Sequence, residues 1–187
     1  VLLNEAADTF GVGRVEAAVV QEVQTFIYER YRNQLTIQHD RAAVDAVIAL
    51  SPPLHQVTAR VRAVEQFSEM PAAASLAAAN KRIGNLLKKA EGDIGNIDPG
   101  LLKEPAEHAL AGMIETLQPR LAHQREQGDF TGSLTTLSSA RDAVDGFFND
   151  VMVMADDPAV RANRLALLAS LHAQMNQVAD ISRLVTQ

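Results

Sequence analysis

Apolar residues recur along this chain at steps of three and four, and this spacing constrains the fold more than any other feature. The first long run comprises Val15, Val19, Val23, Phe26, Ile27, Tyr31 and Leu35. Such spacing places apolar side chains on one face of an α-helix, whereas a half-buried strand would alternate apolar and polar residues. The sequence contains no segment with that alternation, and aromatic residues, which strands favour, are only 4% of it. We therefore predict an all-α fold, a single-domain bundle of roughly six to eight helices over residues 1–187.

Capping residues, prolines and glycines predict where the helices begin and end. Asp40 and either Asp156 or Asp157 suit helix N-caps, because a carboxylate accepts hydrogen bonds from the free N–H groups of the first turn. Pro158 suits the first turn of the last helix, and Gly128 ends the fifth. The predicted helices cover residues 14–35, 40–49, 54–69, 71–89, 101–127 or 105–127, 131–154 or 133–154, and 156–179 or 157–179. The clearest long loop is 91–100, which is rich in helix breakers.

The last two predicted helices form an antiparallel pair around Asp156, Asp157 and Pro158. Residues 151–154, with the sequence VMVM, are predicted as the last turn of the sixth helix, buried on more than one side. The two aspartates would then start the seventh helix, where the positive end of the helix dipole favours carboxylates.

Composition limits the kinds of site that the chain can hold. It has no cysteine, which excludes disulfides, thiolate metal ligands and Cys nucleophiles. Its net charge of -6 argues against bulk binding to nucleic acid but permits a local basic face. The apolar runs all fall short of the ~20 residues that span a bilayer, so we expect no membrane contact. The chain begins with Val rather than Met, so we expect a fragment of a longer protein.

The predicted helix over 71–89 has one basic face. Its apolar stripe comprises Leu76, Ala79, Ile83, Leu86, Leu87 and Ala90. The opposite side carries Lys81, Arg82, Asn85, Lys88 and Lys89, within an arc of roughly 120°. One interpretation is a phosphate-binding face, with Arg82 or Asn80 near a base edge. The other is a solvated face whose cations complement the C-terminal end of the helix dipole.

Arg164 lies within the apolar stripe of the last predicted helix. The stripe comprises Val160, Leu167, Leu168, Leu171, Met175 and Val178. A charge at such a position must be paired and hydrogen-bonded. We predict a structural ion pair with a carboxylate of the preceding helix, for which Asp142, Asp145 and Asp150 are the candidates; an RNA contact is the alternative.

Further polar residues are candidates for ligand binding. Arg161 and Asn163 lie off the apolar stripe and are predicted to be freer to meet a ligand. Near the end of the first long helix, Tyr28, Arg30 and Arg32 could stack on an unpaired base, although an aromatic residue at helical spacing more often belongs to the core.

Histidine and aspartate residues do not form a catalytic pattern in this sequence. The dipeptide His39-Asp40 is found in metal phosphohydrolases, but the further His and Asp ligands that such a site needs are missing. Asp40 is better explained as a helix cap. His108, His123 and His172 lack the spacing of a di-iron bundle. We identify no catalytic residue and no metal ligand.

Three blocks of sequence resemble one family. FFNDVMVMADDPAVRANRLALLASL followed by VADIS, over 147–171 and 178–182, is similar to the carboxy-terminal end of the bacterial glycyl-tRNA synthetase beta subunit. AAANKRIGNLLKKA, over 77–90, and YERYRNQL, over 28–35, resemble further blocks of that subunit. The blocks follow the family's order across most of the chain.

This resemblance implies a helical anticodon-binding domain of the DALR type, although the DALR tetrapeptide itself is absent. It also implies binding to glycine tRNA and a cytoplasmic holoenzyme of two alpha and two beta subunits. In that family the alpha subunit carries the ATP- and Mg-dependent activation of glycine. This fragment would therefore be a non-catalytic part of a ligase, without a cofactor of its own.

Two other functions compete with RNA binding. The first is a structural helical bundle that docks a partner protein through apolar surface. The second is an enzyme that uses His39-Asp40 and a metal. A steep salt dependence of RNA binding would separate RNA binding from protein docking, and the metal content would test the enzyme.

Overall fold

All regular secondary structure in the described part of the chain is helical, which confirms the all-α prediction. The computed structural model describes residues 2–11, 15–90 and 94–185. Its α-helices are α1 (Leu2–Asp8), α2 (Ala17–Leu35), α3 (Arg41–Ile48), α4 (Leu54–Ser68), α5 (Ala73–Lys88), α6 (Pro105–Glu126), α7 (Phe130–Ser138), α8 (Arg141–Asp150) and α9 (Pro158–Met175). Two short 3-10 helices, η1 (Pro99–Leu101) and η2 (Ile181–Leu184), complete the set.

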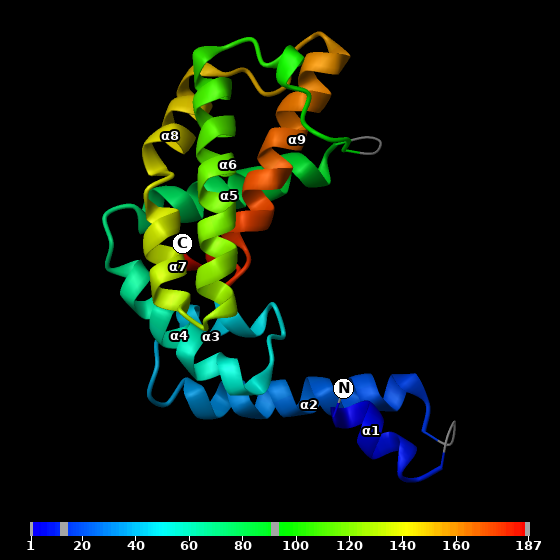
Figure 1. Ribbon diagram of the computed structural model, residues 1–187. Coiled ribbons are helices and arrows are strands. Elements are labelled where there is room, and N and C mark those ends of the chain that lie inside the picture. Colours follow the sequence, from blue (N-terminus) through cyan, green and yellow to red (C-terminus); the bar gives the residue numbers. More distant parts are fainter. Residues whose placement is uncertain (1, 12–14, 91–93, 186–187) are drawn as a thin grey trace.

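The helices pack as a bundle from which a helical pair projects (Figure 1). In the bundle α6 packs against α7, α8 and α9, while α4 packs against α3 and α7. The C-terminal η2 contacts both α3 and α5, and the backbone N–H of Asp180 donates to the carbonyl oxygen of Ala46 at 2.9 Å. The chain after α9 therefore returns to the N-terminal half of the bundle and fixes α5 between the two halves.

The core consists mainly of aliphatic side chains from α3 to η2 together with three phenylalanines, Phe67, Phe130 and Phe147. Its largest fully buried members include Phe67, Phe147, Leu168, Met175 and Ile181. In α2, by contrast, only the C-terminal end is anchored in the bundle, through Tyr28, Tyr31 and Leu35. The N-terminal part of its apolar stripe, including Val19, Val23 and Phe26, is exposed.

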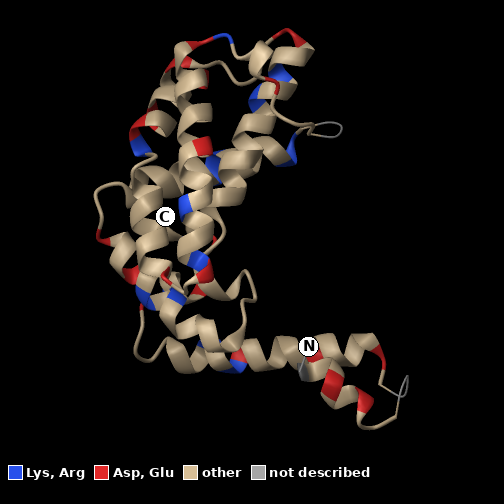
Figure 2. Ribbon diagram, viewed as in Figure 1, with Lys and Arg blue, Asp and Glu red and all other residues tan. Residues whose placement is uncertain are grey.

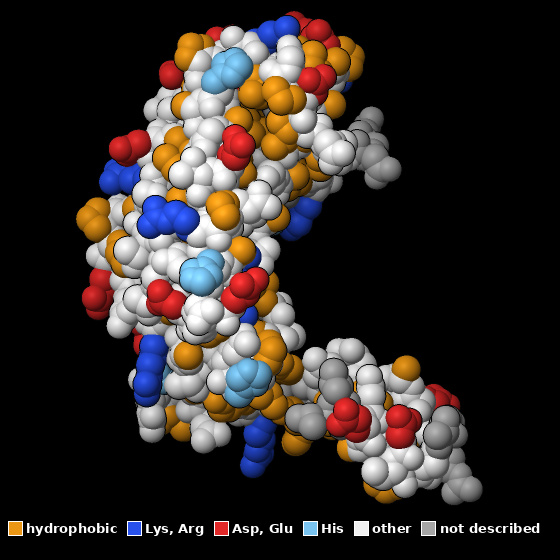
Figure 3. All heavy atoms as spheres, viewed as in Figure 1, with side chains coloured by type: hydrophobic (Ala, Val, Ile, Leu, Met, Phe, Trp, Pro, Cys, Tyr) orange, Lys and Arg blue, Asp and Glu red, His pale blue; other side chains and the backbone are white. Residues whose placement is uncertain are grey.

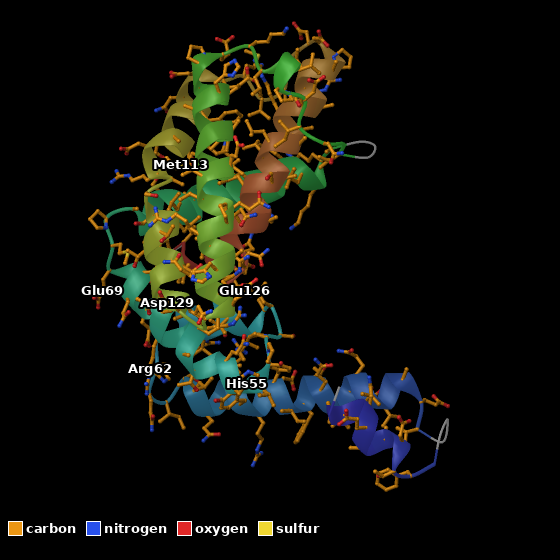
Figure 4. The ribbon with its side chains drawn as sticks, viewed as in Figure 1. His55, Arg62, Glu69, Met113, Glu126 and Asp129 are labelled. Carbon is orange, nitrogen blue, oxygen red and sulfur yellow. The ribbon has the colours of Figure 1, made fainter. Side chains whose placement is uncertain are left out.

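Side-chain caps determine several helix boundaries. Asp40 accepts a hydrogen bond from the N–H of Ala43, and Asp157 accepts from the N–H of Ala159, which confirms both predicted caps. Asp129, at the turn between α6 and α7, caps α7 in the same way (Figure 4). Gly128 follows α6 with a φ of 72°, a left-handed conformation that glycine adopts without strain.

The region predicted as one helix over 131–154 is two helices and an extended segment. The chain turns after Ser138 and starts α8 at Arg141, and α8 ends at Asp150. Residues 151–154 are not a wrapped helical turn: Val151 and Val153 are buried, while Met152 and Met154 are 75% and 51% exposed. This alternation is the period of an extended chain with one face on the core. The prediction of a turn buried on more than one side was wrong.

Other boundaries differ less from the predictions. The short α1 was not predicted, and with the division of 131–154 it raises the count to nine α-helices in the described part of the chain. The last helix ends at Met175 rather than near 179, and η2 follows. Part of the predicted loop, residues 91–93, lies outside the described residues; residues 94–98 are without regular structure and lead into η1. In the described segments, no helix has the length and apolarity needed to cross a bilayer.

Candidate nucleic-acid interface

The helix α5 separates a buried stripe from an exposed basic face, as predicted. Leu76 and Ile83 are fully buried. Lys81, Arg82, Asn85, Lys88 and Lys89 are all exposed. In Figure 2 the ribbon is coloured for basic residues near the end of α5, while acidic residues mark α1 and the start of α2. The two terminal lysines also complement the helix dipole, so their position has a structural benefit that does not depend on a ligand.

Arg82 is held in place by an aromatic ring. Its guanidinium carbon lies 4.2 Å from the centre of the Phe148 ring on α8. Phe148 in turn packs edge-on against Phe147, with the ring centres 5.7 Å apart. A cation over an aromatic face is attracted by the ring quadrupole. Arg82 is therefore exposed to a ligand but has less freedom than the neighbouring lysines.

A groove runs beside α5, and we name it the α5–η2 groove. It has a volume of about 790 Å³, and its lining includes Lys81, Gly84 and Lys88 of α5, His172 and Asn176 at the end of α9, and Arg183 of η2. Figure 3 shows the molecule hollowed on the side where the ends of α5 and α9 face the N-terminal helices. Lys81 also lines the two adjoining hollows, so it stands at the centre of this surface.

Arg183 and His172 line this surface but were not predicted as members of it. Arg183 is exposed and pairs with Asp180 at 3.0 Å. It follows the end of α9, where no helical periodicity indicated its direction. Burial lowers the pKa of His172, and the charge of Lys88 lowers it further, while Asp180 opposes the shift. The imidazole is therefore neutral near pH 7.

Asn80 does not lie on the basic face. It is fully buried, and its amide nitrogen donates to Oδ1 of Asn176 at 2.8 Å. The amide nitrogen of Asn176 donates back to Oδ1 of Asn80 at 3.0 Å. This reciprocal pair joins α5 to the end of α9, so the structure gives Asn80 a structural role in place of the predicted base contact.

Asn163 and Arg161 bind the backbone of neighbouring segments. Asn163 is buried; its Oδ1 accepts from the N–H of Asp98 at 2.7 Å and its amide donates to the Asp98 carbonyl at 3.0 Å. Arg161 is half-buried and donates to the carbonyl oxygen of Ala155 at 2.7 Å. The expectation that both side chains are free for a ligand was wrong, because each holds a loop against α9.

Of the candidate residues on α2, two have structural partners and one is exposed. Tyr28 is buried and its hydroxyl donates to the carbonyl oxygen of Pro52, so the core interpretation holds. Arg32 forms a bidentate pair with Asp45 of α3, at 2.5 and 2.9 Å, which lowers the pKa of that carboxyl through the hydrogen bond. Of these three α2 residues, Arg30 alone is exposed and has no hydrogen-bond or ion-pair partner among the described residues. It lies beside an apolar hollow on α2, away from the basic face of α5.

Arg164 is buried and paired with a carboxylate, as predicted, but the partner is Glu107 of α6. Nε donates to Oε1 at 2.7 Å and Nη2 donates to Oε2 at 3.3 Å. Nη1 donates to the carbonyl oxygen of Met152 at 2.9 Å, which fixes the extended segment. The prediction of a partner on α8 was wrong. α8 ends at Asp150, before the extended segment that leads to α9, so Arg164 faces α6 instead.

The carboxylate of Glu107 is the most enclosed charge of the described chain. Its side chain is 0% exposed, and that of Arg164 is 7% exposed. Burial alone would raise the pKa of Glu107, but hydrogen bonds from Arg164 and from the N–H groups of Glu104 and Lys103, with the Arg164 charge, lower it. This ion pair belongs to the fold and takes no part in the exposed face.

His39 and Asp40 have structural partners. Asp40 caps α3, and Nδ1 of His39 lies 3.2 Å from the carboxylate of Glu65 on α4. In the described residues, no cluster of three or more His, Cys, Asp or Glu side chains is arranged to hold a metal ion.

Comparison of the sequence with known proteins shows the family to which this chain is related. A model of the DALR anticodon binding domain matches residues 76–181, which include most of α5, all of α9 and the start of η2. The glycine–tRNA ligase beta subunit of Methylobacillus flagellatus is 49% identical over 186 residues. Those of Ralstonia nicotianae and Neisseria meningitidis are 46% identical over 186 and 42% identical over 184 residues. Each alignment covers 98% of this chain but only 26%, 26% and 27% of the relative, so the chain spans about a quarter of their length.

Proposed function

The chain belongs to the DALR anticodon binding domain family, and from this premise we propose that it binds the anticodon region of glycine tRNA as part of a glycyl-tRNA synthetase beta subunit. The observation that carries this proposal is the exposed basic face of α5 on a chain with a net charge of -6. Such a local face can hold phosphates of one RNA loop while the rest of the surface repels other polyanions.

The residues proposed for RNA contact are Lys81, Arg82, Asn85, Lys88 and Lys89, to which the structure adds Arg183. The lysines and Arg183 supply point charges for phosphates. Arg82 presents a planar guanidinium, which suits stacking on a base or pairing with its edge.

The partners follow from the same proposal. The chain would act inside a holoenzyme of two alpha and two beta subunits in the cytoplasm. The alpha subunit would use ATP and Mg²⁺ to activate glycine, and this part of the beta subunit would contribute tRNA binding without catalysis. Its role is then to position the tRNA during glycylation.

Binding to two tRNAs tests this function. Every glycine codon begins with GG, so the anticodon of glycine tRNA presents two cytosines. We expect the full chain to bind glycine tRNA more tightly than a copy in which both cytosines are replaced, with affinity falling steeply as salt rises. Equal affinity for the two tRNAs would contradict anticodon recognition, and affinity independent of salt would contradict the basic face.

A contact with protein is the second candidate function, favoured by the exposed apolar face of α2. Val19, Val23 and Phe26 are 44%, 41% and 62% exposed. Since the chain spans about a quarter of its relatives, the occupant we propose is the remainder of the same subunit. Val23→Ser with Phe26→Ser should then lower the melting temperature of the whole subunit and leave that of the 187-residue chain unchanged. Equal melting temperatures of variant and wild-type subunits would show that the face is free.

A further inference from the structure

The wall of the α5–η2 groove includes a glycine, Gly84, that closely faces the ring of His172. Lys81, Gly84 and Lys88 are spaced by three and four residues, so they share one face of α5. A Cβ at Gly84 would lie 3.4 Å from Nε2 of His172, which is an ordinary contact distance. The glycine therefore leaves bare helix backbone opposite the imidazole, and a longer side chain there would enter the groove.

The floor of the groove is rigid. Asn80 and Asn176 exchange two amide hydrogen bonds beneath it, which fixes the distance between α5 and the end of α9. The Asp180 carboxylate also lines the groove, but it accepts hydrogen bonds from Ser182 at 2.6 Å and from Arg183 at 3.0 Å. Its negative charge is thus offset before an RNA approaches.

Two groups in the groove remain available to a ligand. The ring of His172 and the amide of Asn85 both line the groove. Neither side chain forms a hydrogen bond with another of the described residues. Because burial keeps the imidazole neutral, one ring nitrogen is an acceptor. Asn85 contributes amide donors. Leu50 and Leu87 add apolar surface on which a base can lie.

We infer that the α5–η2 groove receives one unstacked cytosine of the anticodon, with the edge of its base over Gly84 and His172 and its phosphates at Lys81, Lys88 and Arg183. In this arrangement Nε2 of His172 accepts from the N4 amine of the cytosine, and the Asn85 amide donates to N3. Uracil presents a carbonyl in place of the amine and is bound less well. The inference rests on the proposed function and adds the nucleotide pocket and its reading residues.

A pair of glycine variants tests the pocket. Gly84→Gln fills the groove, and Gly112→Gln makes the same change on α6, where a Cβ meets no atom within 4 Å. Glutamine is a better helix former than glycine, so both variants should melt no lower than the wild type. We expect Gly84→Gln to weaken binding of glycine tRNA by the full chain roughly tenfold or more, the loss of one base contact, and Gly112→Gln to leave binding unchanged.

Discrimination between tRNAs separates the pocket from the wider function. For the copy of glycine tRNA in which the cytosine of this pocket is replaced by uridine, the ratio of Kd values to wild-type glycine tRNA should fall towards one in Gly84→Gln and in His172→Ala. The ratio for the copy with the other cytosine replaced should be kept. A wild-type chain without discrimination would contradict the proposed function itself. A wild-type chain that discriminates, with both variants retaining the full ratio, would overturn the pocket alone. If Gly84→Gln proves unfolded by circular dichroism, His172→Ala decides the question.

Discussion

Removing the guanidinium of Arg164 should destabilise the fold far more than removing an exposed charge. Arg164→Ala leaves the Glu107 carboxylate, which is 0% exposed, without its cation, and leaves the carbonyl of Met152 without its donor. Breaking a buried pair by removing one partner costs about 3–5 kcal/mol. For a domain of this size each kcal/mol lowers the melting temperature by about 2–4 °C. We therefore expect a decrease of roughly 6–20 °C at pH 7.

The stability lost in Arg164→Ala should depend on pH, because the protonation of Glu107 differs between the two proteins. In the wild type the lowered pKa of Glu107 contributes stability above the usual carboxyl pKa, and that stability is lost as pH falls through the folded value. Without Arg164 the pKa of Glu107 is higher, so the variant binds the proton sooner on acidification. The stability difference between the two proteins should be largest at pH 7 and shrink towards pH 3.

Thermal and urea denaturation followed by circular dichroism measure both effects. Arg141→Ala is the matched control, because its pair with Asp145 is exposed and 3.4 Å long, and such pairs contribute at most about 1 kcal/mol. The reasoning is refuted if Arg164→Ala melts within 2–3 °C of the wild type, or no lower than the control. A stability gap that stays constant with pH would show that Glu107 is not the group involved.

Three further substitutions probe contacts that the structure assigns. Asn163→Ala should lower the stability by about 1–3 kcal/mol in urea denaturation, because both backbone groups of Asp98 lose their partner. Asp157→Ala should cost about 1 kcal/mol in the same assay, as expected for the loss of an N-cap. Arg32→Ala should change the affinity for tRNA less than twofold in a filter-binding assay, because its guanidinium is engaged by Asp45; a tenfold loss would return Arg32 to the RNA-binding set.

Local signals in the sequence predicted the helices and their caps because those features depend on neighbouring residues. Asp40, Asp157 and Gly128 act within one turn of their own position, and their roles were confirmed. The segment 151–154 was assigned wrongly, since a run of apolar residues that alternate between buried and exposed along an extended chain resembles a short helical turn in composition.

Long-range partners were beyond what periodicity can predict. The stripe of α9 indicated that Arg164 needed a carboxylate, but the choice of Glu107, 57 residues away, depends on how α6 and α9 pack. Polar residues just off a stripe were predicted as free, whereas Asn80 and Asn163 meet amide and backbone partners 96 and 65 residues away. The exposed cations of α5 were predicted correctly because exposure follows directly from the helical period.

The salt dependence of tRNA binding by lysine variants tests the basic face of α5 most directly. Lys81→Ala and Lys88→Ala should each weaken binding to glycine tRNA and each lower the slope of log K against log salt by about 0.7, the value for one phosphate of a single strand. Lys103→Ala is the matched control, because Lys103 is exposed but precedes α6. Melting temperatures should fall by at most about 4 °C, since these side chains leave the core intact and Lys88 loses only its interaction with the helix dipole. A double variant Lys81→Ala, Lys88→Ala that keeps the wild-type affinity and slope would contradict the claim that this face binds RNA.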